Sequence, residues 1–328
     1  MENASKLEIE SLTERPEGSA IGSARVAMTN ISQRREMWKK LKAGKVSGSE
    51  ICTAAGLNKY ETPLQLWARK CGLIDEKIES DQMWLGTKLQ TTLADFFVKK
   101  TDLRVDLCDE LWISEEHPWA CVSPDLLWWD PFTPDSFGLG ELKTSGSWAA
   151  PEWGEDKCPD AARMQIIWGM GITGGALTQG YVIGLLDGRA NKFFYPRVNF
   201  DNDIWQYMLE LGRDFVEKVE KKIQPKASAR DEDLLDKIIQ KKETPVELNP
   251  NEAEVLFRAY DEAKEYYDLC QYKAKVAKEA IDDVKAQFRA LTNGAAVGTW
   301  NDRKVMITER RRAGYTVQPA SWVEVKVK

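Results

Sequence analysis

Two acidic residues and a lysine have the types and spacing that suit metal-assisted hydrolysis. Asp125 follows a Ser-Pro pair, and the triplet Glu141-Leu142-Lys143 comes later in the chain. Side chains alternate along a strand, so Glu141 and Lys143 share one face while Leu142 points into the core. Two carboxylates and a backbone carbonyl make an oxygen-rich site that suits Mg²⁺ or Mn²⁺.

The chemistry of such a site would be hydrolysis of a phosphate ester. A bound cation stabilises charge on the attacked phosphate and lowers the pKa of a bound water. Lys143 would then orient or deprotonate the attacking water and shield the developing negative charge. The pattern alone also fits a strand with alternating charges on a solvated face, and this reading stays open.

The rest of the composition narrows the chemistry. His117 is the only histidine in the chain, whereas Ser-His-Asp, Cys-His and H-E-x-x-H sites each need specific histidines. No C-x-x-C pair occurs among the cysteines, which argues against a zinc knuckle, an iron–sulfur cluster or a disulfide framework. We therefore expect catalysis by carboxylates, lysine and a hard cation. The six cysteines are Cys52, Cys71, Cys108, Cys121, Cys158 and Cys270.

The net charge and the absence of long apolar stretches bear on which partners the chain binds and where it is located. The net charge is −6, which does not by itself indicate a nucleic-acid partner. A local basic groove, however, governs phosphate affinity more than the net charge of the chain does. The N-terminal residues contain no apolar run, and no apolar stretch is long enough to cross a bilayer. We expect no membrane partner and a cytoplasmic location.

The elements that would position these residues belong to an α/β domain. Residues 1–30 read as a mobile tail, 31–223 as a compact α/β domain, 224–248 as a linker with one helix, and 249–328 as a helical and β C-terminal extension. If the strand of Asp125 pairs with the strand ending at Lys143 across a 130–138 hairpin, Asp125 meets Glu141 at one strand end.

Helical periodicity marks the segments around this hairpin. Apolar residues recur at three- and four-residue steps in 81–100 and in 160–172. Ser49 resembles a helix cap, and Asn249-Pro250 is typical of the start of a long helix that runs to Leu291.

Four motifs occur along the chain in the order GLNKYETP, MWLGTKLQ, SPD…GLGELKTS and ARMQIIWGMGITG. The third resembles a PD-(D/E)xK core, and all four, in this order, resemble motifs of the YqaJ-type viral recombinase family of phage lambda exonuclease-like nucleases. The resemblance spans residues 31–200. It implies a restriction-endonuclease-like core, with a central mixed β-sheet flanked by helices.

The resemblance also implies roles for particular residues. Asp125, Glu141 and the Leu142 carbonyl would bind the metal, Lys143 would be the catalytic lysine, and Gln165 would line the site from its helix.

A 5′-phosphate pocket is implied by the same resemblance. It would use Lys42, Ser49 and Ser123, because hydroxyls and an ammonium group suit a phosphate. For Ser49 a capping role is an equally good account and is compatible with the pocket role.

The chain departs from the family pattern at three positions. Gln90 stands where the family has an acidic residue, and Ala162 and Ile167 replace a tyrosine and a glutamine near Gln165. Gln90 offers a carbonyl oxygen but no negative charge, so metal affinity should be weaker if it occupies that place.

Two tryptophans follow Lys143 in a polar loop. Trp148 and Trp153 suit either stacking on a splayed base or packing against the domain, and both readings stay open.

The family resemblance implies an Mg²⁺-dependent exonuclease that resects linear duplex DNA ends, 5′ to 3′, for phage-type recombination by single-strand annealing. Its implied partners are double-stranded DNA ends, a single-strand annealing protein and further copies of the chain in a ring trimer. The alternative is a DNA-end binding module that has lost activity through Gln90. An adaptor protein that acts through its long helix is a third hypothesis.

Overall fold

The computed structural model describes residues 15–76, 78–239 and 244–308. The chain divides into two compact units, 1–241 and 242–328. The division falls inside the segment that the sequence predicts as a linker. Each unit is described by itself.

The first sheet of the N-terminal unit has five strands in the order β1-β2-β5-β6-β3. All neighbouring strands are antiparallel except β3 and β6, which run parallel. The strands are β1 (Ala20–Ile21), β2 (Ala24–Thr29), β3 (Val46–Ser47), β5 (Glu110–Ser114) and β6 (Ala120–Val122).

Strand β2 differs from the mobile tail that the sequence predicts over 1–30. Ala24, Val26 and Met28 are buried, at the two-residue spacing of a strand that covers a core with one face. A single short alternation beside Gly and Pro gives little signal by itself, because its pairing partner β5 is distant in sequence. Residues 1–14 of the predicted tail lie outside the described residues.

The second sheet carries the strands that matter for chemistry. Its order is β10-β9-β8-β7-β4, with β11 also paired to β9. Strand β8 is antiparallel to β7 and parallel to β9, so the sheet is mixed. The strands are β4 (Arg104–Leu107), β7 (Leu126–Asp130), β8 (Thr133–Ser145), β9 (Gln179–Leu186), β10 (Phe193–Phe194) and β11 (Arg197–Asn199).

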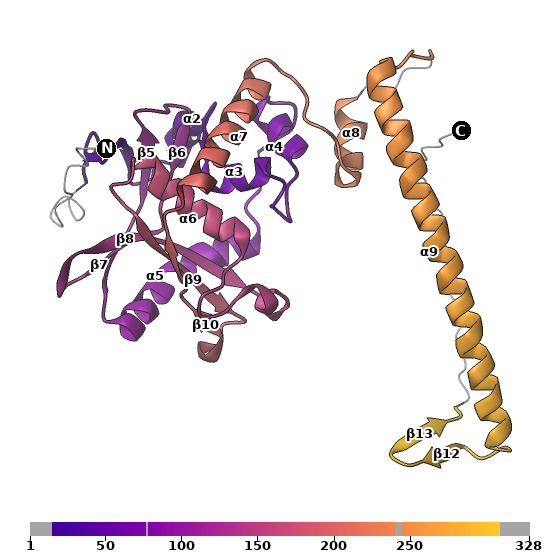
Figure 1. Ribbon diagram of the computed structural model, residues 1–328. Helices are drawn as coiled ribbons and strands as arrows, with labels where there is room; N and C mark the ends of the chain where they lie inside the picture. The colour runs from indigo at the N-terminus through magenta and orange to yellow at the C-terminus, as the bar shows by residue number, and fades with distance from the viewer. Residues whose placement is uncertain (1–14, 77, 240–243, 309–328) are drawn as a thin grey trace. The chain divides into compact units, whose positions relative to one another are not determined.

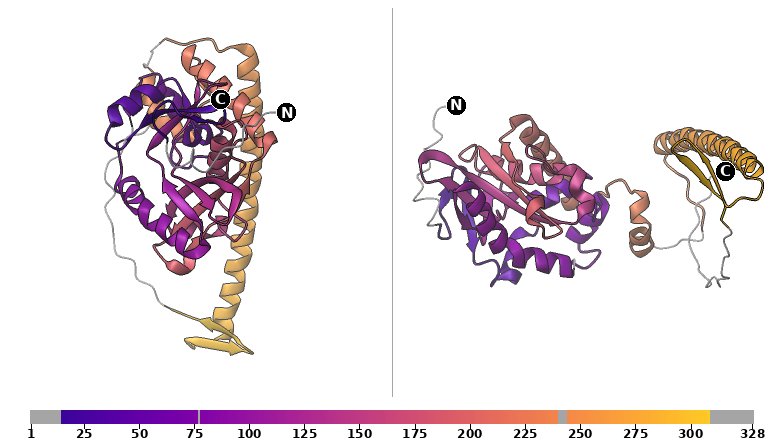
Figure 2. Two further views of the ribbon diagram at one scale, coloured as in Figure 1. Left: turned by 90° about the vertical axis from the view of Figure 1, so that its left-hand side faces the viewer. Right: turned by 90° about the horizontal axis from the view of Figure 1, so that it is seen from below.

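Helices α5 (Asp81–Thr101) and α6 (Asp160–Ile172) belong to different apolar clusters. Helix α5 buries Phe97 in a cluster with Trp128, whereas α6 buries Ile166 in a cluster with Leu139. Side chains alternate along β7 and β8, so the two clusters lie on opposite faces of the sheet, and helices are seen on both sides of the strands (Figures 1 and 2). This arrangement confirms the predicted α/β class with a mixed sheet flanked by helices.

Helices α3, α4 and α7 pack together with α6, because α3 contacts the other three. Helix α2 instead packs Trp38 and Leu41 against a cluster on the first sheet. The helices are α2 (Arg35–Lys42), α3 (Gly48–Ala54), α4 (Pro63–Lys70), α7 (Asn202–Glu220) and α8 (Glu232–Ile238), with short 3-10 turns η1 (Ser147–Glu152), η2 (Ala190–Lys192) and η3 (Ala229–Asp231).

The C-terminal unit consists of helix α9 (Pro250–Leu291) and a hairpin of β12 (Val297–Trp300) and β13 (Arg303–Met306). Asn249 Oδ1 accepts hydrogen bonds from two amides of the first turn of α9, which confirms the predicted start at Asn249-Pro250. In the described part of the chain, no helix combines the length and apolar composition needed to cross a membrane.

Candidate active site

The pairing of β7 with β8 positions Asp125. Leu126 lies opposite Gly140, so Asp125 stands beside the Glu141–Leu142 segment. Asp125 Oδ2 accepts a hydrogen bond of 2.7 Å from the Leu142 amide. A side chain at Gly140 would meet Leu126 at 2.3 Å, so this close approach of the two strands depends on glycine.

Glu141 and Lys143 share one face of β8, as strand alternation predicts. Lys143 Nζ lies 2.5 Å from Glu141 Oε1, while the Leu142 side chain is buried in the cluster beneath α5. Glu141 is only 8% exposed. A buried carboxylate needs such a positive partner, because burial alone penalises its charge.

Gln90 reaches the same place from α5. Its Nε2 donates a hydrogen bond of 3.1 Å to Asp125 Oδ1. The amide therefore neutralises no charge but satisfies one carboxylate oxygen. Four side chains from α5, β8 and the residue before β7 thus converge, namely Gln90, Asp125, Glu141 and Lys143.

Burial and the neighbouring Glu141 carboxylate raise the pKa of Asp125 to about 7, although Lys143 and the Leu142 amide act in the opposite direction. Burial would lower the pKa of Lys143, but Glu141 and Asp125 outweigh it and raise that pKa above its usual value. Lys143 is therefore charged at neutral pH. One ammonium group does not balance two carboxylates, so a further cation beside Asp125 and Glu141 would be favourable.

The raised pKa of Asp125 has a consequence for stability. Its carboxyl binds a proton more tightly in the folded than in the unfolded chain, so the fold loses stability as pH rises from about 4 to about 7. We expect Asp125→Asn to raise the melting temperature of metal-free protein near pH 8 by several degrees and to change it little near pH 4, since about 1 kcal/mol corresponds to roughly 2–4 °C in a domain of this size.

Thermal denaturation of wild-type and Asp125→Asn protein in EDTA at the two pH values measures this difference. An equal shift at both pH values would show that Asp125 is not the titrating group.

The donor set fits a hard divalent cation. Asp125 and Glu141 supply carboxylate oxygens, and the Leu142 carbonyl follows directly after Glu141 in the sequence. The Gln90 amide has an oxygen that a rotation of its side chain could present. Among the described residues, no group of three His, Cys, Asp or Glu side chains gathers to hold a metal. The proposed metal-binding set therefore has two carboxylates, whereas an acidic residue at position 90 would give it three.

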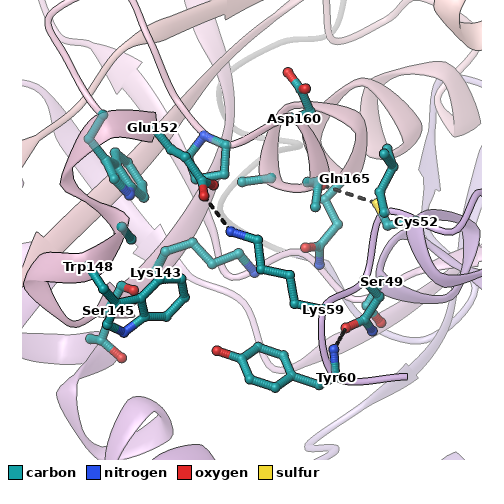
Figure 3. Close-up of a pocket in the computed structure, with 18 residues that line it drawn as sticks. Ser49, Cys52, Lys59, Tyr60, Lys143, Ser145, Trp148, Glu152, Asp160 and Gln165 are labelled. Atoms are coloured by element: carbon teal, nitrogen blue, oxygen red, sulfur yellow. Dashed lines mark hydrogen bonds and ion pairs between the residues drawn. The ribbon is translucent and has the colours of Figure 1, made fainter. Parts of the chain in front are cut away.

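A cavity of about 510 Å³ opens beside Lys143. Ser49 from α3 and Gln165 from α6 line it together with Lys143 and Trp148 (Figure 3). The predicted site residues Ser49, Gln165 and Lys143 therefore border one space large enough for a small ligand.

Residues 37–176 match the model of the YqaJ-like viral recombinase domain. The uncharacterized protein YqaJ of Bacillus subtilis (strain 168) is 23% identical over 275 residues, which cover 82% of this chain and 80% of that protein. Asp125, Glu141, Lys143 and Gln165 lie within residues 37–176.

Two solved structures are similar to part of this chain. An alkaline exonuclease from Laribacter hongkongensis has a TM-score of 0.46 and 19% identity, covering 57% of this chain and 94% of that chain. A phage-related exonuclease from Haemophilus somnus 129PT has a TM-score of 0.38 and 11% identity, covering 55% of this chain and 96% of that chain.

Lys42 and Ser123 both lie beside Trp38. The Trp38 indole donates to Ser123 Oγ at 3.4 Å, and Lys42 Nζ lies 4.8 Å from the indole ring centre. Lys42 lines a small pocket with Trp38, whereas Ser49 borders the cavity of Lys143. A joint phosphate site of Lys42, Ser49 and Ser123 remains a prediction.

The cap of α3 corrects the prediction for Ser49. Ser47 is the N-cap, and its amide donates a 3.0 Å hydrogen bond to Glu50 Oε2. Ser49 lies in the first turn instead. The S-x-x-E spacing of Ser47 and Glu50 is the sequence signal for this capping box, and it was visible in the sequence.

Glu50 itself is the centre of a buried ion cluster. Its carboxylate lies 3.1 Å from Lys70 and 3.6 Å from Lys42. Burial would raise the pKa of Glu50, but Lys42, Lys70 and the Ser47 amide lower it to about 2. Lys42 is thus held next to Trp38 by an acid that stays ionised at neutral pH.

We expect Glu50→Gln to cost about 2–3 kcal/mol of unfolding free energy at neutral pH, because it leaves the buried ammonium groups without their counter-charge. The folded pKa lies below the unfolded one, so this stability is present above about pH 4.5 and is lost as pH falls towards 2. Urea denaturation at several pH values measures the difference between variant and wild type. A difference that persists unchanged at the acid end would contradict the assignment to this carboxylate.

Lys59 and Tyr60 also line the cavity, although the sequence analysis assigned them no role. Both lie within the GLNKYETP motif, in a loop where no periodic pattern marks individual residues. Of the two tryptophans after Lys143, Trp153 is buried and packs over Gly184, whereas Trp148 is 60% exposed. Trp153 is therefore a packing residue.

Proposed function

We propose that this chain is a metal-dependent exonuclease that degrades linear duplex DNA from its ends for recombination by strand annealing. The observation that carries the proposal is the convergence of Asp125, Glu141 and Lys143 with Gln90 where β7 begins and β8 ends, next to an open cavity. The match to a viral recombinase domain supports a role in recombination.

Asp125, Glu141 and the Leu142 carbonyl would hold Mg²⁺ or Mn²⁺, with the Gln90 amide oxygen as a further donor. When bound, the cation stabilises negative charge on a phosphate and lowers the pKa of water. The Leu142 amide keeps Asp125 fixed through its 2.7 Å hydrogen bond, so one strand segment orients both ligands.

Lys143 would act on the attacking water and on the phosphate. Its ammonium group is charged at neutral pH and paired with Glu141. It can donate a hydrogen bond to water or to a phosphate oxygen, which places positive charge where negative charge develops in the transition state. Gln165 would position groups in the adjoining cavity through its amide.

The test is release of nucleotides from DNA. We expect acid-soluble nucleotides from 5′-phosphorylated linear duplex with Mg²⁺ or Mn²⁺, none with EDTA, and none from covalently closed circles. Comparing labels at the 5′ and 3′ ends gives the polarity, which we propose to be 5′ to 3′. Cleavage of closed circles at the same rate would overturn the exonuclease proposal.

Gln90 supports a second candidate, a DNA-end binding module without activity. The site has two carboxylates, and the amide hydrogens of Gln90 face Asp125. This candidate gives tight binding of linear ends without nucleotide release in either metal.

The partners follow from the proposed role. We propose a single-strand annealing protein as the recipient of the exposed strand, a ring trimer as the assembly and the cytoplasm as the location. Sedimentation of the purified chain tests the trimer independently of activity.

A further inference from the structure

The rim of the cavity beside Lys143 carries two aromatic side chains in an exposed position. Tyr60 is 77% exposed and Trp148 is 60% exposed, and both line the cavity (Figure 3). Aromatic surface left in water is unfavourable unless a ligand covers it. A pair of such rings next to a catalytic centre suits a planar, uncharged group.

The segment that carries Trp148, the 3-10 turn η1, is fixed by contacts with the residues after β9. The Ser147 amide donates a 2.7 Å hydrogen bond to Asp187, which also pairs with Lys192 at 3.2 Å. A side chain at Gly146 would meet the Trp148 ring at 2.8 Å, so the indole lies directly against the backbone there. Trp148 is therefore exposed without being free to swing through that space.

The wall that bears Tyr60 is anchored in the same manner. Arg230 of η3 donates to the backbone carbonyls of Asn58 and Lys59, at 3.2 and 2.8 Å. The Asn58 side chain accepts a 2.8 Å hydrogen bond from the Tyr60 amide. Two loops distant in sequence thus present one ring each to the same cavity.

Groups of both charges line the cavity. Lys143, Ser49 and Gln165 supply an ammonium, a hydroxyl and an amide, which suit a phosphate. Glu152 and Asp160 also line the cavity, and their carboxylates disfavour an anion near them.

Lys59 separates the carboxylate of Glu152 from the indole. Its ammonium pairs with Glu152 and lies 5.0 Å from the centre of the Trp148 ring. This cation–π contact covers part of the indole and offsets the nearby negative charge. Because Lys59 is already paired with Glu152, the surface around the Trp148 ring suits a neutral ring better than a second phosphate.

We propose that Tyr60 and Trp148 form a nucleobase-binding subsite that receives the terminal base of the strand being degraded. This inference rests on the proposed function in one respect, namely that a DNA strand end enters the cavity of Lys143. The base stacks on the exposed rings while its phosphate reaches Lys143. Stacking is tolerant of sequence, because every base has a π-face.

Binding measurements test the subsite without relying on cleavage. The probes are fluorescently labelled, 5′-phosphorylated duplexes whose terminal nucleotide is either normal or abasic, titrated in Ca²⁺ in place of Mg²⁺ and followed by anisotropy. The variants are Trp148→Ala, Trp148→Phe and Tyr60→Ala. Tyr207→Ala is the matched control, because Tyr207 is 56% exposed on α7 and does not line the cavity.

We expect wild-type protein to bind the normal end more tightly than the abasic end, by roughly five- to hundredfold for one stacked base. Trp148→Ala and Tyr60→Ala should weaken binding of the normal end and leave the abasic end nearly unchanged. Trp148→Phe should keep most of the preference, and Tyr207→Ala should keep all of it.

Two results would overturn the subsite: no preference for the normal end in wild type, or an equal loss on both probes in Trp148→Ala. Failure of the proposed function looks different. Wild type would then release no nucleotides in Mg²⁺ or Mn²⁺, while a base-dependent preference that needs Trp148 would still support the subsite.

Discussion

Lys143→Ala is expected to lower metal-dependent nucleotide release from linear duplex DNA by about 10²- to 10⁴-fold, the range typical of a lost proton-transfer or charge-stabilising group. Lys143 is the cation that pairs with Glu141 at 2.5 Å and borders the cavity. Its loss removes the positive charge nearest to the position proposed for the phosphate. Initial rates at saturating DNA and metal measure the effect.

The matched control is Lys218→Ala, which removes a lysine that pairs with Asp214 on the surface of α7. It should retain wild-type rates. Lys143→Ala also leaves Glu141 without its partner, so the melting temperature of the variant must be recorded, and Lys143→Arg tests whether charge alone suffices. Full activity in a folded Lys143→Ala protein would rule the mechanism out.

Gln90→Glu is expected to tighten Mn²⁺ binding by about ten- to hundredfold, because it adds a negative charge beside two carboxylates. The carboxylate would stand where the Gln90 amide now donates to Asp125 Oδ1 at 3.1 Å. Calorimetric titration with Mn²⁺ measures the affinity, and nucleotide release at limiting Mn²⁺ measures the consequence.

Gln90→Ala serves as the comparison, since it removes the same hydrogen bond without adding charge, and it should not tighten metal binding. If wild type binds DNA ends but does not degrade them, degradation restored by Gln90→Glu would identify the chain as an end-binding module that lost its activity at this position. An unchanged Mn²⁺ affinity in Gln90→Glu would show that this side chain does not face the metal.

The core of the site was predictable because its residues lie in regular elements. Alternation placed Glu141 and Lys143 on one face and Leu142 in the core. The pairing of β7 with β8 followed from two adjacent β-rich segments, and it brought Asp125 to Leu142. The alternation of side chains is clear in β7 and β8, and two strands that are adjacent in sequence have few other ways to pair.

Other features depended on contacts between distant segments. Strand β2 pairs with β5, more than eighty residues later in the chain, so its short alternation carries little information alone. Trp148 and Trp153 look alike in sequence, and only the packing of Trp153 over Gly184 separates them. The roles of Lys42 and Ser123 depend on Trp38, which no spacing rule connects to them.

The tight turn between β7 and β8 has a practical consequence. Phe132 at its tip is 86% exposed. It lies nine residue positions before Glu141 along extended β8, a span of roughly 30 Å at about 3.3 Å per residue. The register that positions Asp125 is set at Leu126 and Gly140, far from the tip. A small peptide handle or fluorophore grafted at Phe132 would therefore report on tumbling and assembly of the molecule while leaving the hydrolytic centre undisturbed.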